Sequence, residues 1–84
     1  MYVLRCADDS LYCGITTDIE RRLKEHNGSP KGAKYTRARR PVTLLFSYSC
    51  ESRSIATRLE LKFKSLQRHQ KLQLLSEKNF DALL

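Results

Sequence analysis

The 84-residue sequence lacks any long apolar segment. A membrane-spanning helix needs roughly 20 consecutive apolar residues, and a secretory signal needs an apolar core near the start of the chain. Neither pattern occurs, so we expect no membrane span and no signal peptide. A chain of this length can form one small hydrophobic core. We therefore expect a single domain over residues 1–84, which excludes a multidomain enzyme.

Cysteine is scarce and irregularly spaced, at positions 6, 13 and 50. An odd number of cysteines, without a C-x-x-C pair or a secretory signal, favours free thiols in a reducing cytoplasm. The two histidines, His26 and His69, lie far apart in the sequence, so a structural zinc site is not expected. The plainest interpretation makes the three cysteines small core side chains.

Several common catalytic signatures are also missing. The sequence has no G-x-S-x-G, P-loop, H-E-x-x-H or dinucleotide-binding motif. It has no internal repeat and no low-complexity tract. Any activity must therefore be argued from other residue patterns.

Acidic residues are absent from the middle of the chain. The net charge is +7, and residues 31–50 hold five basic residues and no acidic one. Such a cluster attracts polyanions. A solvated loop is the plainer interpretation of a basic run, but the whole chain is basic, which favours nucleic acid. A membrane surface is less favoured, because no apolar helical face accompanies these charges.

The basic loop supplies the predicted nucleic-acid contacts. We expect these to be Lys31, Lys34, Tyr35, Arg37, Arg39 and Arg40. The tyrosine either stacks on a base or packs within the fold.

The hydrophobic pattern predicts an α+β fold in the order β-β-α-β-α-α. Residues 2–6 and 11–15 are rich in β-formers and flank a turn of Asp and Ser residues, which indicates a hairpin. Gly14 within a strand suggests a bulge or a close approach of another group. Residues 42–50 alternate between apolar and polar residues, which predicts a third strand with one apolar face: Val42, Leu44, Phe46 and Tyr48.

Helical spacing and caps predict the remaining elements. Thr17 with Glu20 forms a capping-box pattern for a helix that ends near residue 28. One helical turn is expected around residues 33–37. Ser52 or Ser54 begins a later helix with an apolar stripe. Residues 70–75 and 79–84 are expected to form shorter helical pieces.

The helix after the hairpin carries two polar residues on its apolar face. Helical spacing places Ile19 and Leu23 on that face, together with Arg22 and His26. Because the two apolar residues must contact the core, Arg22 and His26 flank that contact and point toward the body of the protein. A partly buried arginine requires an anionic partner.

Five residues have side chains suited to phosphodiester cleavage: Tyr2, Tyr12, Arg22, His26 and Glu60. Tyrosine or histidine can take a proton from water, and arginine can stabilise the charge of the transition state. One carboxylate can hold a Mg²⁺ ion that keeps most of its waters. The plainer alternatives are that the two tyrosines are ordinary aromatic residues of the sheet, and that Arg22 and Glu60 form a structural ion pair.

The order of these motifs resembles the GIY-YIG nuclease superfamily. The segment Leu11–Asn27 is similar to the second half of its signature, and Tyr2–Leu4 to the first half without its Gly-Ile. The "YIG" triplet reads Tyr12-Cys13-Gly14 here. The loop over residues 32–42 resembles that of short single-domain bacterial members and of junction-resolving nuclease domains. Residues 56–64, with Glu60, resemble the metal-ligand helix of the family.

The resemblance implies a three-stranded antiparallel sheet flanked by helices and a metal-dependent endonuclease that hydrolyses DNA. Tyr2 and Tyr12 would bracket the site, with one of them assisting water deprotonation. Arg22 would contact the scissile phosphate, and His26 would support acid–base chemistry or orient a tyrosine. Glu60 would ligate one Mg²⁺ or Mn²⁺ ion.

The family's known members suggest structure-selective cleavage in DNA repair or recombination, with RNA not excluded and a protein partner left open. Some homing members use a downstream asparagine, for which Asn79 is a candidate. The alternative function is a nucleic-acid-binding module with little or no catalysis. An adaptor for another protein has no specific support in the sequence.

The two tyrosines can share a site only if the hairpin has a particular geometry. An even-length turn that pairs Cys6 with Leu11 would place Tyr2 and Tyr12 on opposite faces of the sheet. An odd loop or a bulge shifts the parity by one residue. We therefore predict such a feature within residues 7–10 or near Gly14.

Overall fold

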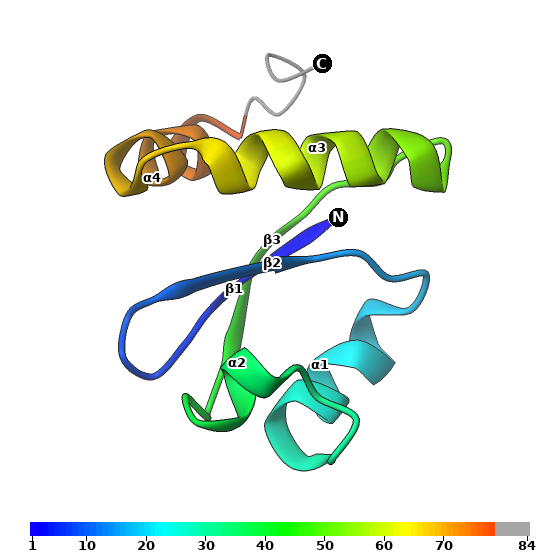
Figure 1. Cartoon of the computed structure of the whole chain (residues 1–84), viewed down its shortest axis with the longest axis vertical. Helices are drawn as coiled ribbons and strands as arrows, with labels where there is room; N and C mark the ends of the chain where they lie inside the picture. The colour runs from blue at the N-terminus through cyan, green and yellow to red at the C-terminus, as the bar shows by residue number, and fades with distance from the viewer. Residues whose placement is uncertain (79–84) are drawn as a thin grey trace.

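The computed structural model describes residues 1–78. Its elements are β1 (Tyr2–Arg5), β2 (Leu11–Gly14), α1 (Ile19–Gly28), α2 (Lys34–Arg37), β3 (Thr43–Ser47), α3 (Arg53–Ser65) and α4 (Arg68–Glu77). The strands form one antiparallel sheet in the order β2-β1-β3. In Figure 1, α1 and α2 lie on one side of the sheet, and α3 and α4 lie on the other. The expected α+β architecture is confirmed, while Asn79 and the predicted helical piece at 79–84 lie outside the described residues.

The β1–β2 hairpin has the odd loop that the shared-site prediction requires. Arg5 pairs with Leu11 and Leu4 pairs with Tyr12, so five residues connect the strands. The amide of Cys6 donates to the Ser10 carbonyl at 2.8 Å, and Asp9 adopts a left-handed conformation with φ of 67°. A left-handed residue at this point is typical of a hairpin loop with a bulge. As a result, Tyr2 and Tyr12 lie on the same face of the sheet, with their ring centroids 6.4 Å apart.

Strand β3 differs from the simple alternation that its sequence predicts. Its register on β1 shifts between Val3, which faces Phe46, and Leu4, which faces Leu44. The extra residue, Leu45, is a bulge. The predicted single apolar face is therefore wrong, because a bulge reverses which side chains face each side.

The bulge sends the apolar residues in and next to β3 to two cores. Val42 packs on the α1 side of the sheet, whereas Phe46 and Tyr48 pack on the α3 side. Leu44 and Leu45 remain exposed at the sheet edge.

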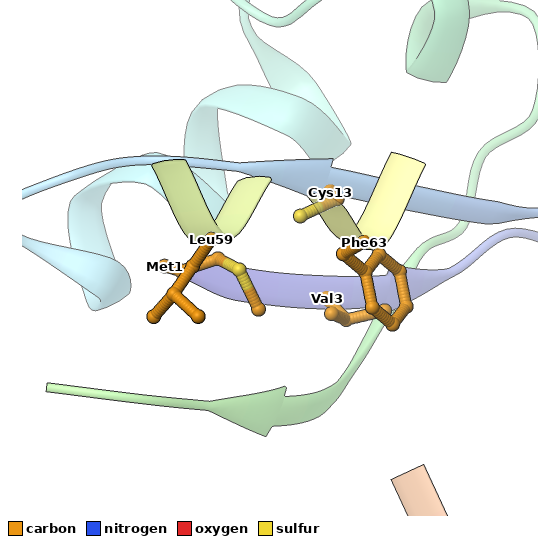
Figure 2. Close-up of a cluster of buried hydrophobic side chains, with 5 residues drawn as sticks. All are labelled: Met1, Val3, Cys13, Leu59 and Phe63. Carbon is orange, nitrogen blue, oxygen red and sulfur yellow. The ribbon is translucent and has the colours of Figure 1, made fainter. Parts of the chain in front are cut away.

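The α3 side of the sheet holds the larger hydrophobic core. Val3 and Cys13 from the strands meet Leu59 and Phe63 from α3, with Met1 beside them (Figure 2). Leu59 and Phe63 are 0% and 1% exposed, so the predicted apolar stripe of this helix is confirmed. Burying a side chain of this size contributes about 1.5–3 kcal/mol.

The α1 side of the sheet holds a smaller core, into which the tyrosines project. Tyr2 and Leu4 are buried there with Val42, and Ile19 and Leu23 of α1 pack against them. This contact fixes the rotation of α1, as the sequence predicts. The next residues on the same helical face, Arg22 and His26, are thereby directed toward the sheet.

The helix caps differ from the predictions in one place. Helix α1 begins one residue later than the Thr17 capping box implies, because the Asp18 carboxylate accepts from the Arg21 amide at 3.1 Å and acts as the N-cap. Aspartate is among the most favourable N-cap residues. For α3, the Ser52 hydroxyl accepts from the Ile55 amide, so the first of the two predicted serines is the cap. No helix within residues 1–78 is both long and apolar enough to span a bilayer.

Candidate active site

Tyr2 and Gly14 define the floor of the candidate site. Tyr2 is 2% exposed, and its ring lies over the backbone of its cross-strand partner Gly14. A Cβ at position 14 would come within 2.5 Å of the Tyr2 hydroxyl and 2.7 Å of its ring. The glycine in this strand therefore serves a close approach, as the sequence predicts.

His26 holds the Tyr2 hydroxyl in place. The Tyr2 oxygen lies 2.8 Å from Nε2 of His26, and Nδ1 lies 2.9 Å from the Thr36 hydroxyl. The Thr36 hydroxyl donates to the Ala33 carbonyl at 2.9 Å. These three contacts are all satisfied when Nδ1 carries the imidazole proton, and we assign this tautomer on that basis. The Ala33 amide also donates toward Nδ1, at the longer distance of 3.3 Å, and this weaker contact is the one that the assigned tautomer does not satisfy.

In this tautomer a chain of donors runs through the buried side chains. Tyr2 donates to Nε2 of His26, and Nδ1 donates to Thr36. Both His26 and Thr36 are 0% exposed. Because the whole chain of donors is shielded from water, the orientation of the imidazole is fixed by these partners alone.

Burial shifts the pKa values of Tyr2 and His26 in opposite directions. It raises the pKa of Tyr2 to about 12, although a hydrogen bond from Arg22 acts against the shift. Burial, and next the positive charge of Arg22, lower the pKa of His26 below its ordinary value. At neutral pH the phenol is therefore protonated and the imidazole is neutral. A neutral Nε2 can receive the phenolic proton.

Arg22 connects the Tyr2–His26 pair to an open cleft. Its guanidinium contacts the Tyr2 hydroxyl, and Nη1 donates to the Glu25 carboxylate at 3.0 Å and to the Lys31 carbonyl at 2.8 Å. The side chain is 25% exposed and lines a cleft between α1 and α3. The anionic partner that its position requires is Glu25, and the remaining N–H groups can bind a phosphate from the cleft side.

Tyr12 completes an aromatic cluster on this face. Its ring packs edge-on against His26, with centroids 5.1 Å apart, and stacks on Tyr35 at 6.0 Å. The guanidinium of Arg39 lies 3.9 Å from the centre of the Tyr35 ring. Tyr12 and Arg39 thus pack against the Tyr35 ring, so the structure favours the packing alternative over base stacking.

Glu60 is not part of the tyrosine cluster. It lies on α3, on the far side of the sheet, with Oε1 3.5 Å from Nζ of Lys64. Burial, and next the charge of Glu60, raise the pKa of the Cys13 thiol to about 12. The structure brings Tyr2, Tyr12, Arg22 and His26 together, and the ion pair of Glu60 is with Lys64 and not with Arg22.

The side chains of the site can hold a divalent metal ion only if the ion keeps most of its waters. Within residues 1–78, no group of three or more His, Cys, Asp or Glu side chains is placed to hold a metal. Mg²⁺ commonly binds through one or two carboxylates, substrate phosphates and several waters. Glu60, whose side chain is 18% exposed, fits that mode and does not fit a complete protein cage.

Two of the predicted nucleic-acid contacts, Arg39 and Arg40, are bonded to other groups of the protein. Arg40 donates to the carbonyls of Glu25, His26 and Ser29 and so caps the C-terminal end of α1. Arg39 pairs with Asp8 of the hairpin at 3.1 Å and donates to the Tyr35 carbonyl.

The other three basic side chains of the loop point outward. Lys31, Lys34 and Arg37 are exposed. Among the described residues, their charged ends have no hydrogen-bond or ion-pair partner. They remain available for phosphate groups, whereas Arg39 and Arg40 fix the loop in place.

Comparisons with known proteins identify the family of the chain. The family model for the GIY-YIG catalytic domain matches residues 1–73. The chain belongs to the GIY-YIG family.

Its similar relatives are small proteins of the UPF0213 group. The UPF0213 protein DP2720 of Desulfotalea psychrophila is 49% identical over 99% of this chain and 77% of the relative. The UPF0213 protein RBAM_000440 of Bacillus velezensis is 53% identical over 92% of this chain and 77% of the relative. The solution structure of the UPF0213 protein BH0048 from Bacillus halodurans is 48% identical, covers 92% of this chain and 81% of that one, and has a TM-score of 0.61.

Membership of the GIY-YIG family has a direct functional meaning. It indicates a nuclease-like activity, for which nucleic acid is the expected partner and a divalent metal the typical cofactor. The predicted family and fold are therefore confirmed at this level.

Two residues of the candidate site were missed by sequence reasoning. Thr36 is the buried partner of His26, and Gly32 lets the loop pass α1, because a Cβ there would lie 2.6 Å from the Glu25 carbonyl and 3.0 Å from the His26 Cα. Both lie in the loop that resembles other family members, which is the only signal that could have singled them out.

Proposed function

We propose that this protein is a metal-dependent endonuclease that hydrolyses phosphodiester bonds in DNA, with a preference for branched, flapped or unpaired structures. The observation that supports it best is the contact of Tyr2, His26 and Arg22 on the face shared with Tyr12. Those groups provide a proton acceptor and a cation at one place, as phosphodiester hydrolysis requires. A role in DNA repair or recombination would follow from such a substrate preference.

In the proposed mechanism, Tyr2 and His26 move one proton. The phenol oxygen takes a proton from the attacking water and passes its own proton to Nε2 of His26, 2.8 Å away. The lowered pKa of His26 keeps the imidazole neutral and ready for this step. Thr36 holds the Nδ1 proton and so keeps Nε2 free to accept.

Arg22 binds the scissile phosphate and stabilises its added negative charge. Its bonds to Glu25 and to the Lys31 carbonyl fix the guanidinium before substrate arrives. A preorganised cation of this kind contributes more than a flexible one, because it needs no reorganisation in the transition state. Tyr12 packs against His26 and holds the imidazole from the other side.

A divalent ion, Mg²⁺ or Mn²⁺, would be held by Glu60 together with water and substrate phosphate. It would supply Lewis-acid stabilisation of the departing oxygen. The three free cysteines are consistent with a reducing cytoplasm as the compartment of action.

The test uses purified protein with Mg²⁺ or Mn²⁺ and a panel of blunt, flapped, branched and single-stranded DNA and RNA. We expect cleavage of an unpaired or branched DNA. We expect Tyr2→Phe, Arg22→Ala and Glu60→Gln each to lower kcat by about 10²–10³-fold, with substrate binding retained. Arg58→Ala and Glu51→Gln, which alter exposed charges elsewhere on the surface, serve as matched controls with wild-type kcat.

The alternative is a nucleic-acid-binding module with little or no catalysis. The three outward-pointing basic side chains, Lys31, Lys34 and Arg37, would support it equally. Tight binding without cleavage of any substrate would replace the nuclease by this module. Cleavage that survives in all three site variants would show that Tyr2, Arg22 and Glu60 do not form the active site.

A further inference from the structure

A cleft of about 750 Å³ opens at one end of the sheet, between α1 and α3. We call it the α1–α3 cleft. It is lined by Met1, residues 15–17 after β2, the part of α1 between Ile19 and Glu25, residues 47–50 at the end of β3, and the N-terminal end of α3 with its cap Ser52. Arg22 of the candidate active site lines it, but Tyr2, Tyr12 and His26 do not. The cleft therefore begins at the scissile-phosphate residue and extends away from the reacting groups.

The residues that line the α1–α3 cleft carry an excess of positive charge. Arg21 and Arg53 line it from opposite sides, on α1 and α3. Both are exposed, and among the described residues neither guanidinium has a hydrogen-bond or ion-pair partner. The one carboxylate among the lining residues, Glu25, is already bonded to Arg22. Two unpaired cations that face one cavity create a site for an anion.

The remaining lining residues suit a sugar-phosphate backbone. Hydroxyl groups come from Thr17, Ser47 and Ser49, and apolar surface comes from Ile15 and Ile19. The volume lies within the range of about 300–1,000 Å³ that accommodates a ligand of nucleotide size. A base-paired duplex is far too wide to enter a cavity of this volume, whereas one unpaired strand can do so.

We infer that the α1–α3 cleft binds an unpaired DNA strand next to the scissile phosphate, with one backbone phosphate on Arg21 and Arg53. The inference rests on the proposed function for the position of the scissile phosphate at Arg22. It adds a reason for structure selectivity: a substrate must present unpaired nucleotides to reach both the cleft and the active site. Arg21 and Arg53 are then specificity residues and take no part in the reaction itself.

The test compares two DNA ligands that share one duplex, one blunt and one with a single-stranded flap. Binding is measured without divalent metal, so that it does not depend on cleavage, for wild type and for Arg21→Ala/Arg53→Ala. We expect the double variant to bind the flapped DNA about tenfold more weakly for each arginine that no longer binds phosphate. The log–log salt slope should fall by about 0.7 for each single-strand phosphate that is no longer neutralised. Binding of the blunt duplex should change by less than about twofold, within the effect of an exposed substitution.

Two further variants sharpen this result. Arg58→Ala, on α3 like Arg53 but outside the cleft lining, should bind both DNAs as wild type does. Arg21→Lys/Arg53→Lys keeps both charges and should restore the salt slope. Equal losses of affinity on blunt and flapped DNA, or wild-type binding by the double alanine variant, would overturn the inference.

The outcomes separate this inference from the proposed function. If wild type cleaves flapped DNA but the double variant binds it normally, the nuclease stands and the cleft assignment is wrong. If wild type cleaves nothing but the double variant loses flap binding, the cleft assignment stands and the nuclease is wrong.

Discussion

At the scale of single residues, His26 is the most constrained group in the protein. It is fully buried, and both ring nitrogens are engaged, one by Tyr2 and one by Thr36. Its pKa is lowered by burial first and by Arg22 next. The imidazole is thus kept neutral, which suits a proton acceptor and costs stability whenever it must be protonated.

This burial predicts a pH dependence of folding. The unfolded chain binds a proton on His26 near its ordinary pKa of about 6.5, whereas the folded protein binds it only at lower pH. The free energy of unfolding should therefore be fully retained above pH ~6.5 and decrease as the pH falls toward the folded-state pKa. For one proton the slope is at most ~1.4 kcal/mol per pH unit.

Urea denaturation at pH 7.5, 6.5 and 5.5 measures this slope. His26→Gln should flatten it, while His69→Gln, which removes an exposed histidine on α4, should leave it unchanged. A wild-type slope in His26→Gln would show that another group controls this pH range.

At the scale of elements, the loop after α1 is organised by its own arginines. Arg40 caps α1 by donating to three backbone carbonyls, and Arg39 ties α2 to the hairpin through Asp8. Unsatisfied carbonyls at a helix C-terminus are commonly bonded by basic side chains. Part of the positive charge in this loop therefore stabilises the fold that holds His26 and Thr36.

Arg40→Ala should destabilise the protein by about 1–2 kcal/mol, because three carbonyls lose their charged hydrogen-bond donor and water replaces it only in part. Thermal unfolding measures the change. Arg37→Ala, which removes an exposed arginine of the same loop, is the matched control and should stay within about 0.5 kcal/mol of wild type. Equal melting temperatures for the two variants would contradict the capping role.

At the scale of the whole molecule, the two faces of the sheet have different roles. The α3 side carries the larger hydrophobic core, and the α1 side carries the tyrosines, His26 and Arg22. The outward-pointing basic residues lie on the loop beside the candidate active site, so a polyanion attracted to the loop is brought close to Arg22. Long-range attraction of this kind depends on ionic strength.

The triple variant Lys31→Gln/Lys34→Gln/Arg37→Gln should lower the salt dependence of duplex DNA binding. The log–log slope should decrease by about 0.9 for each duplex phosphate that is no longer neutralised. The measurement is fluorescence anisotropy over a range of salt concentrations.

Lys24→Gln/Arg58→Gln/Lys62→Gln removes the same net charge from exposed helix positions and should change the slope less. Equal slopes for the two triple variants would show that net charge, and not the basic loop, determines binding.

Much of the architecture follows from the sequence alone. The strand and helix positions, the hairpin and the face of α1 that carries Arg22 and His26 all follow from residue periodicity and local turn chemistry. The odd hairpin loop could also be predicted once the family resemblance placed Tyr2 and Tyr12 in one site, because two strand residues that share a site must have matching parity. These features are determined locally, since each depends on residues a few positions apart.

Only the tertiary structure decided the rest. The bulge at Leu45, the capping role of Arg40 and the packing of Tyr12 and Arg39 against Tyr35 depend on which distant segments meet. The same holds for Thr36 as the partner of His26, for the pairing of Glu60 with Lys64, and for the α1–α3 cleft. Strand register and helix packing fix these contacts, and the sequence pattern of one segment does not contain the positions of its partners.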